Sequence, residues 1–224
     1  MNRVQQPTEN KSMGPLRKAT STLAIEIRLG LVHLRGRFKA RKFNGQTGLK
    51  LHIGCGPKLK NGWVNIDLGG RADINLDARR RLPFADGCCA IVYSEHFLEH
   101  LDYPAESKSF LNECHRVLQP GGVFSAGVPD TEWPLKAYWE GITSEYFKHA
   151  KQIWHPKWCV TRMEHINYHF RQGCEHRFAY DFETLKYVLE KAGFVQVRRR
   201  DFDPRLDSKD RELGTLYVEG LKPT

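Results

Sequence analysis

Residues 49–56 read Leu-Lys-Leu-His-Ile-Gly-Cys-Gly, a short apolar run that ends in a Gly-x-Gly turn. Such a run predicts a buried strand, and the glycines let backbone amides approach a ligand where a side chain would clash. A second run, Trp-Val-Asn-Ile-Asp-Leu at residues 63–68, follows after only eight residues, 55–62. A parallel crossover normally needs a dozen or more residues, so the sequence predicts that the first helix is reduced to a turn or lost.

The rest of the chain alternates between strand and helix patterns. Further strands are expected at residues 74–76, 90–93, 123–128, 194–197 and 216–218, and helices at 104–118 and 181–193. This alternation is typical of an α/β sheet that binds ligands at the carboxyl ends of its strands. We expect residues 1–48 to form an arm and residues 49–224 to form one domain, in which residues 131–180 are a substrate-side insertion.

Positive charge is concentrated in the arm. Residues 1–50 hold 11 Lys and Arg against 2 acids, whereas residues 51–224 hold 24 of each, which accounts for the net charge of +9. Apolar residues recur in the arm at spacings of three and four, and basic residues fall on another face, which predicts an amphipathic helix over residues 20–43. The apolar set is Leu23, Ile27, Leu31, Leu34 and Phe38, and the basic set is Arg28, Arg35, Lys39 and Lys42.

Two interpretations of this helix are open. It could pack on the domain with a solvated basic side, or it could contact anionic lipid headgroups. Nucleic acid is disfavoured as a partner because the body of the protein is neutral. There is no apolar run of membrane-spanning length, no signal-peptide pattern and no repeated cysteine spacing. The sequence therefore predicts a cytoplasmic protein, with a possible location at the inner face of the membrane.

Two acids follow the predicted strands next to the Gly-x-Gly turn. Asp67 ends the second strand and could accept hydrogen bonds from a ribose diol, because a carboxylate has two acceptor oxygens. Asp77 follows the third strand and could accept from an exocyclic amine such as that of adenine. The third glycine of a dinucleotide fingerprint is missing, and Asp67 comes only 13 residues after Gly54, so these spacings favour a methyltransferase over a dehydrogenase.

The series LKLHIGCGP, WVNIDL, DARRRLPFADG, AIVYSEHFLEHL and NECHRVLQPGGVFSAGVPD resembles the class I S-adenosylmethionine-dependent methyltransferases, in particular small bacterial type-11-like members. The resemblance runs from residue 49 to residue 130 and resumes in DFETLKYVLEKAGF. It implies a Rossmann-like fold with a seven-stranded, mostly parallel sheet, an aromatic-rich insertion after strand 5, and S-adenosylmethionine as the cofactor.

The same resemblance implies roles for individual residues. The methionine part of the cofactor would face the glycine turn, the ribose would face Asp67, and the adenine would face Asp77 and the Ala78 amide. Residues just past the fourth strand, Ser94, Glu95 and His96, would form the floor beneath the methyl group. The complete predicted cofactor set is Gly54, Cys55, Gly56, Pro57, Asp67, Leu68, Asp77, Ala78, Ser94 and Glu95. One departure is His52, which stands where many members carry an acid that binds the cofactor's amino group.

Residues 131–180 hold 11 of the 25 aromatic residues and five of the ten histidines. This stretch is expected to form either an ordinary aromatic core or the wall of a substrate pocket. The candidate general bases are His96, which follows the fourth strand, and His176. The His and Cys residues of this stretch match no common zinc spacing, so no metal site is predicted.

These features predict a methyltransferase that acts on a small-molecule or lipid-linked acceptor, with O-methylation of a saccharide in cell-surface glycan biosynthesis as the specific hypothesis. Two alternatives remain open at this point. One is an RNA methyltransferase guided by the basic arm, and the other is a non-catalytic relative that retains the fold and binds a partner.

Overall fold

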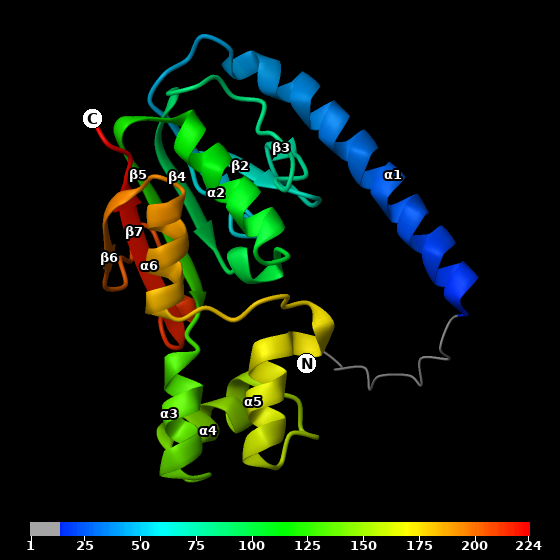
Figure 1. The fold of residues 1–224 in the computed structure, drawn as a ribbon, viewed down its shortest axis with the longest axis vertical. Helices are drawn as coiled ribbons and strands as arrows, with labels where there is room; N and C mark the ends of the chain where they lie inside the picture. The colour runs from blue at the N-terminus through cyan, green and yellow to red at the C-terminus, as the bar shows by residue number, and fades with distance from the viewer. Residues whose placement is uncertain (1–13) are drawn as a thin grey trace.

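The computed structural model describes residues 14–224, so the first 13 residues of the predicted arm lie outside the described part. Seven strands form one sheet in the order β3-β2-β1-β4-β5-β7-β6 (Figure 1). Strands β1 to β5 are parallel, and β7 runs antiparallel to β5 and β6. The strands are β1 Leu49–Ile53, β2 Val64–Asp67, β3 Ile74–Asn75, β4 Cys89–Glu95, β5 Leu118–Pro129, β6 Val195–Arg199 and β7 Thr215–Leu221. The predicted seven-stranded, mostly parallel sheet is confirmed.

One face of the sheet is apolar and is covered by α2 (Ala105–Val117) and α6 (Phe182–Lys191) (Figure 1). Aromatic rings join the layers: Phe110 of α2 lies against Phe124 of β5, and Phe124 lies against Phe194, which precedes β6. All three rings are buried in the main core. Because side chains alternate along a strand, the residues next to Phe124 point to the opposite face.

The opposite face is covered by a loop, residues 200–214, that connects β6 to β7. No helix lies between β1 and β2, as the short spacing predicts. The loop covers the space instead: Lys60, between β1 and β2, donates to the carbonyl oxygen of Leu206, and the Tyr93 hydroxyl of β4 donates to Asp207 at 3.0 Å. The loop therefore takes the position that a crossover helix would occupy.

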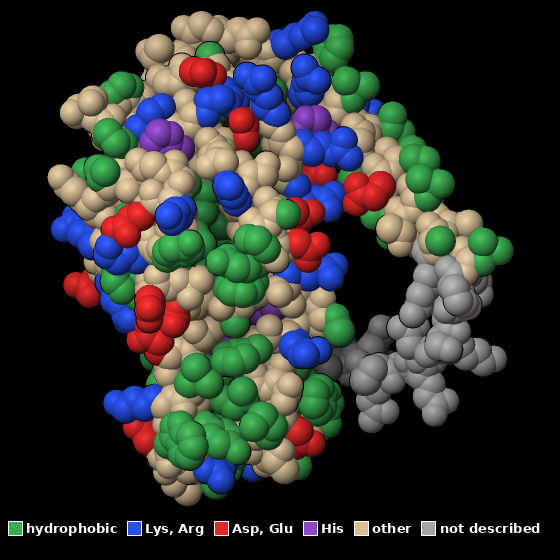
Figure 2. Space-filling model, in the orientation of Figure 1, with side chains coloured by type: hydrophobic (Ala, Val, Ile, Leu, Met, Phe, Trp, Pro, Cys, Tyr) green, Lys and Arg blue, Asp and Glu red, His purple; other side chains and the backbone are tan. Residues whose placement is uncertain are grey.

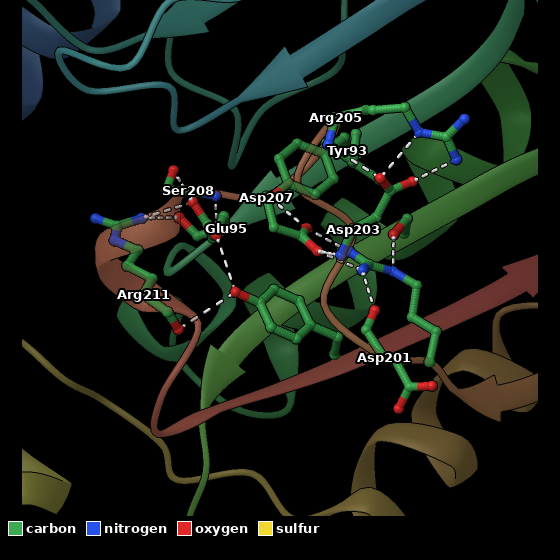
Figure 3. A network of polar contacts seen from close by, with 12 residues as sticks. Tyr93, Glu95, Asp201, Asp203, Arg205, Asp207, Ser208 and Arg211 are labelled. Atoms are coloured by element: carbon green, nitrogen blue, oxygen red, sulfur yellow. Dashed lines mark hydrogen bonds and ion pairs between the residues drawn. The ribbon is translucent and has the colours of Figure 1, made fainter.

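A buried ion pair within this loop is hydrogen-bonded to the sheet (Figure 3). The Arg200 guanidinium contacts the two oxygens of Asp207 at 2.6 and 2.7 Å and also donates to the Ser125 hydroxyl of β5 at 3.0 Å. The side chains of Arg200 and Asp207 are 11% and 0% exposed. A pair this well buried and hydrogen-bonded is costly to break, because the remaining charge has no partner.

A group of helices inserted after β5 forms a second, smaller core below the sheet in Figure 1. Its buried centre consists of Ala137, Tyr146, Phe147, Ala150 and Ile166. The helices are α3 Glu132–Glu140, α4 Glu145–His149, the π-helix η3 Ala150–Trp154 and α5 Arg162–Arg171. Short 3₁₀ turns elsewhere are η1 Arg41–Phe43, η2 Leu98–His100, η4 Gln172–Cys174 and η5 Lys209–Arg211.

The N-terminal helix α1 (Pro15–Ala40) packs on the edge of the sheet with an unexpected face. A Cβ on Gly36 would lie 2.3 Å from the carbonyl oxygen of Asn75, so only glycine permits this approach. The His33 ring contacts the carbonyl oxygen of Asp77, and Ala40 is buried. The buried positions of the docked face are therefore small or polar residues, because the helix lies so close to β3.

The apolar stripe of α1 lies in solvent as a result. Its members Leu23, Ile27, Leu31, Leu34 and Phe38 are each more than half exposed, and hydrophobic side chains follow the outer edge of the helix (Figure 2). The apolar stripe is not the face that packs on the domain. None of the helices that the structure describes is long and apolar enough to cross a membrane.

We expect the Asp207→Asn substitution to lower the free energy of unfolding by about 3 kcal/mol, because it leaves the buried Arg200 guanidinium without its charge partner. Urea unfolding followed by circular dichroism measures this. The matched control is Arg205→Gln, which removes an exposed ion pair to Asp203 in the same loop and should leave the transition unchanged. Equal midpoints for Asp207→Asn and the unsubstituted protein would show that the buried pair does not hold the loop.

Candidate active site

A cavity of about 420 Å³ lies at the carboxyl ends of β1 and β2. This volume is within the range of small-molecule sites, roughly 300–1,000 Å³. Six residues of the predicted cofactor set line it: Gly54, Gly56, Asp67, Leu68, Asp77 and Ala78. The structure adds Phe97, His100, Leu101 and Arg211, which the sequence did not single out as cofactor contacts, and it also places His96 in the wall.

The glycine turn shapes one side of this cavity. Gly54 and Gly56 have φ values of +68° and +51°, a conformation that other residues rarely adopt. A Cβ on Gly54 would also lie 2.7 Å from the ring of Phe97. The turn therefore needs glycine at Gly54 both for its backbone angle and for the close approach of this ring.

Asp67 is positioned by the same turn. One of its carboxylate oxygens accepts from the Gly56 amide at 2.9 Å, and the other accepts from the Gly69 amide at 3.2 Å. Each carboxylate oxygen can accept more than one hydrogen bond, so the half-buried side chain keeps acceptor capacity toward the cavity. This arrangement fits the predicted contact with a ribose diol.

Asp77 lies in the cavity wall, but its carboxylate already has partners. It accepts from the Arg79 amide and guanidinium at 2.9–3.1 Å and from Arg80 at 3.3 Å. The Arg79 guanidinium also donates hydrogen bonds to Glu26 of α1 and to Glu106 of α2. Asp77 thus joins the two helices to the sheet, and an adenine amine would share the carboxylate with these arginines.

Four residues of the predicted cofactor set, Cys55, Pro57, Ser94 and Glu95, are not among those that line the cavity. The buried Glu95 carboxylate points to the other face of the sheet, where it accepts from the amide and hydroxyl of Ser208 at 3.0 and 2.5 Å (Figure 3).

His52 also turns away from the cavity: its ring packs against Tyr93 and contacts the Asn65 side chain. Burial lowers the pKa of His52 to about 4, so the ring is neutral at physiological pH. It carries no charge that could attract the cofactor.

A second cavity, of about 380 Å³, lies between the helical insertion and the β6–β7 loop. The insertion supplies Trp154, His155, Tyr168 and His169 to its wall, and the loop supplies Asp210 and Arg211. His96 and Arg211 line both cavities. One histidine and one arginine therefore form part of the wall of both spaces.

His96 is held at this junction in a strained conformation. Its φ is +54°, which is uncommon for a residue other than glycine and is often found at functional sites. The His96 amide donates to the Gly127 carbonyl at 2.8 Å, and the ring Nε2 lies 2.9 Å from the Thr215 hydroxyl. Burial lowers the pKa of His96 to about 3, so the ring is neutral at physiological pH.

His176, the second predicted base, lines the second cavity. It belongs to a group with Glu99 and His100 in which one ligand-type atom from each lies within 4.8 Å of the others. Burial raises the pKa of Glu99 to about 8. A signal for this group is present in the sequence, because Glu-His occurs twice at a spacing of four, at residues 95–96 and 99–100.

These features place two cavities that share lining residues beside an α/β sheet. The model of a family described as a methyltransferase domain matches residues 69–126 of the chain, a segment that includes β3, β4, α2 and most of β5. No curated protein matches the sequence.

Several solved structures are similar to this chain. An S-adenosylmethionine-dependent methyltransferase from Archaeoglobus fulgidus is 19% identical over 86% of this chain and 94% of its own, with a TM-score of 0.48. A protein from Bordetella parapertussis described as a possible exported protein is 15% identical over 99% of this chain and 77% of its own, with a TM-score of 0.49.

Phosphoethanolamine N-methyltransferase 2 from Haemonchus contortus, in complex with S-adenosyl-L-methionine, is 14% identical over 85% of this chain, with a TM-score of 0.45. The alignment covers 52% of that protein, so the present chain spans about half of its length.

The sheet order is that of the class I S-adenosylmethionine-dependent methyltransferases, and the matched segment is that of a methyltransferase domain. The predicted cofactor, S-adenosylmethionine, is therefore confirmed. The residues that hold it remain a prediction, and the cavity beside the Gly54 turn fits the cofactor by its volume, its glycines and its ribose-type acid.

We expect Asp67→Asn to weaken S-adenosylmethionine binding by about 1–3 kcal/mol, because it removes charged hydrogen bonds to the ribose. Isothermal titration calorimetry with S-adenosylmethionine and S-adenosylhomocysteine measures the change. Asp86→Asn, an exposed acid that lies outside the cavity, is the matched control and should bind as the unsubstituted chain does. Unchanged affinity in Asp67→Asn would reject the ribose assignment.

Proposed function

We propose that this protein methylates a hydroxyl group of a small or lipid-linked acceptor, and that the acceptor is a saccharide of cell-surface glycan biosynthesis. The observation that supports this most directly is that the second cavity adjoins the cofactor cavity and shares His96 and Arg211 with it. A methyl group must pass directly between its donor and its acceptor, so the two must bind in spaces that meet.

Residues of the junction would orient the acceptor and take its proton. S-adenosylmethionine, when bound, supplies a methyl group made electrophilic by its sulfonium sulfur. His96 is our candidate for the base, because it lines both cavities, its backbone amide donates to the Gly127 carbonyl, and its ring is held by the Thr215 hydroxyl. His176, on the wall of the second cavity, is the second candidate.

The wall of the second cavity is suited to a polar molecule with an apolar face. Trp154 and Tyr168 provide aromatic surface, and Gln172, Asp210 and Arg211 provide hydrogen-bonding groups. Apolar walls with a few placed polar groups are characteristic of small-molecule sites. This combination supports a saccharide over an extended nucleic acid.

The test is formation of S-adenosylhomocysteine by the full chain with three groups of acceptors: saccharides and their lipid-linked forms, small amines, and RNA. We expect turnover with hydroxyl-bearing saccharides and none with the corresponding deoxy analogues, amines or RNA. Turnover with amines or RNA alone would overturn the proposal.

A variant shows whether turnover comes from this site. His96→Asn retains a residue that tolerates positive φ, and we expect it to reduce turnover by about 100-fold while cofactor affinity stays unchanged. His115→Gln, on α2 against Phe194 and outside both cavities, is the control and should retain full turnover. An unchanged turnover rate in His96→Asn would show that His96 is not the base and has a packing role.

We also propose that α1 brings the protein to an anionic lipid surface where a lipid-linked acceptor would reside. The stripe of Leu23, Ile27, Leu34 and Phe38 is exposed, and exposed Arg28 and Arg35 lie beside it on the helix. An apolar face flanked by cations is the pattern of helices that lie in the headgroup region. The excess of +9 in residues 1–50 gives charge complementarity to anionic lipid.

Sedimentation with vesicles tests this contact. We expect the full chain to bind phosphatidylglycerol vesicles more tightly than phosphatidylcholine vesicles, and less tightly as salt rises. The double variant Ile27→Asp/Leu34→Asp should bind at least about 10-fold more weakly, since two apolar side chains no longer enter the lipid. Tyr187→Asp, at an exposed position on α6, should bind normally; equal binding of all three proteins would reject the contact.

A further inference from the structure

Three side chains that can ligate a metal lie close together beside the two cavities: Glu99, His100 and His176. Their ligand atoms lie within 4.8 Å of one another, so one point lies within about 2.8 Å of all three. Bonds of roughly 2.0–2.2 Å from zinc to imidazole nitrogen and carboxylate oxygen would then require movements of less than about 1 Å. His100 lines the cofactor cavity and His176 lines the second cavity.

Both imidazoles are oriented as metal ligands are. Nδ1 of His100 donates to the Glu175 carbonyl oxygen at 3.1 Å, and Nδ1 of His176 donates to the His169 carbonyl oxygen at 3.2 Å. Because a carbonyl oxygen can only accept, each Nδ1 carries the ring proton and each Nε2 keeps a free lone pair. Metal-binding histidines are typically fixed by such a second hydrogen bond.

The Glu99 carboxylate is the second, independent observation. Glu99 is 1% exposed, and neither of its oxygens has a hydrogen-bond partner among the described residues. Its Oε1 lies 3.6 Å from Nδ1 of His96 and 4.0 Å from Nε2 of His100. A buried carboxylate without partners is strongly unfavourable, and a bound cation would satisfy both oxygens.

We propose that Glu99, His100 and His176 bind a divalent transition-metal ion, with zinc as the best match to the ligands. Two imidazoles and one carboxylate suit zinc and related ions, whereas magnesium and calcium prefer oxygen ligands throughout. Three protein ligands also leave a fourth position open, as in catalytic zinc sites.

The role of the ion rests on the proposed function, although its binding does not. The open position would accept the hydroxyl oxygen of the acceptor, and a bound cation lowers the pKa of such a hydroxyl. The proton would then pass to His96, which adjoins Glu99. The ion would hold the acceptor oxygen at the junction of the two cavities.

Titration of the full, metal-free chain with Co²⁺ tests the site, because Co²⁺ takes zinc-like geometry and absorbs visible light. We expect one bound Co²⁺ per chain, with a tetrahedral spectrum and no thiolate charge-transfer band. Glu99→Gln and His100→Ala should each weaken binding by at least about 10-fold. His100 is partly exposed, so this variant is expected to fold, and circular dichroism checks both proteins.

The control is Cys159→Ser, since His155, Cys159 and His165 form a second group with ligand atoms within 4.8 Å. This variant should bind Co²⁺ as the unsubstituted chain does. A thiolate band that disappears in Cys159→Ser, or full binding in both Glu99→Gln and His100→Ala, would overturn the proposal.

This titration contains neither cofactor nor acceptor, so its outcome is separate from that of the proposed function. If the chain does not bind Co²⁺, the metal site is rejected. The proposed function, which is tested by the formation of S-adenosylhomocysteine, is not affected by that result. Failure of the acceptor assay would leave a metal site without an assigned reaction.

Discussion

Both cavities depend on the β6–β7 loop, which is held by an internal ion pair between Arg200 and Asp207 and by the hydrogen bonds of this pair to the sheet. Residues 54–63 connect β1 to β2 without a helix, so one face of the sheet would be bare if the β6–β7 loop did not lie across it. The pair is almost fully buried, and Tyr93 of β4 adds a hydrogen bond to the same carboxylate. With this loop in place, Arg211 reaches the junction of the two cavities.

Hydrogen bonds from the same loop give Glu95 a structural role. Strand β4 alternates its side chains between the two faces, and Glu95 points to the face that the loop covers. There it accepts from Ser208 and from the Tyr217 hydroxyl. The two glutamates therefore differ: Glu95, the last residue of β4, is hydrogen-bonded to the sheet and the loop, whereas the buried Glu99 carboxylate has no hydrogen-bond partner among the described residues.

The helical insertion lies below the sheet, and α1 packs on its β3 edge (Figure 1). The insertion has its own core around Tyr146 and Phe147, which lets its other aromatic residues, including Trp154, form the wall of the second cavity. Helix α1 is tied to the sheet at Gly36 and through Arg79, which contacts Glu26. Its apolar stripe remains free for a surface outside the protein.

The sequence by itself determined the order of strands and helices, the short first crossover and the glycine turn with Asp67, because apolar periodicity and glycine placement act over a few neighbouring residues. Only the tertiary structure decided which face of α1 packs, what covers the sheet beside Tyr93, and that His176 joins Glu99 and His100. Those contacts join residues up to about 150 positions apart, as Lys60 and Leu206 do, and local patterns do not encode such distances.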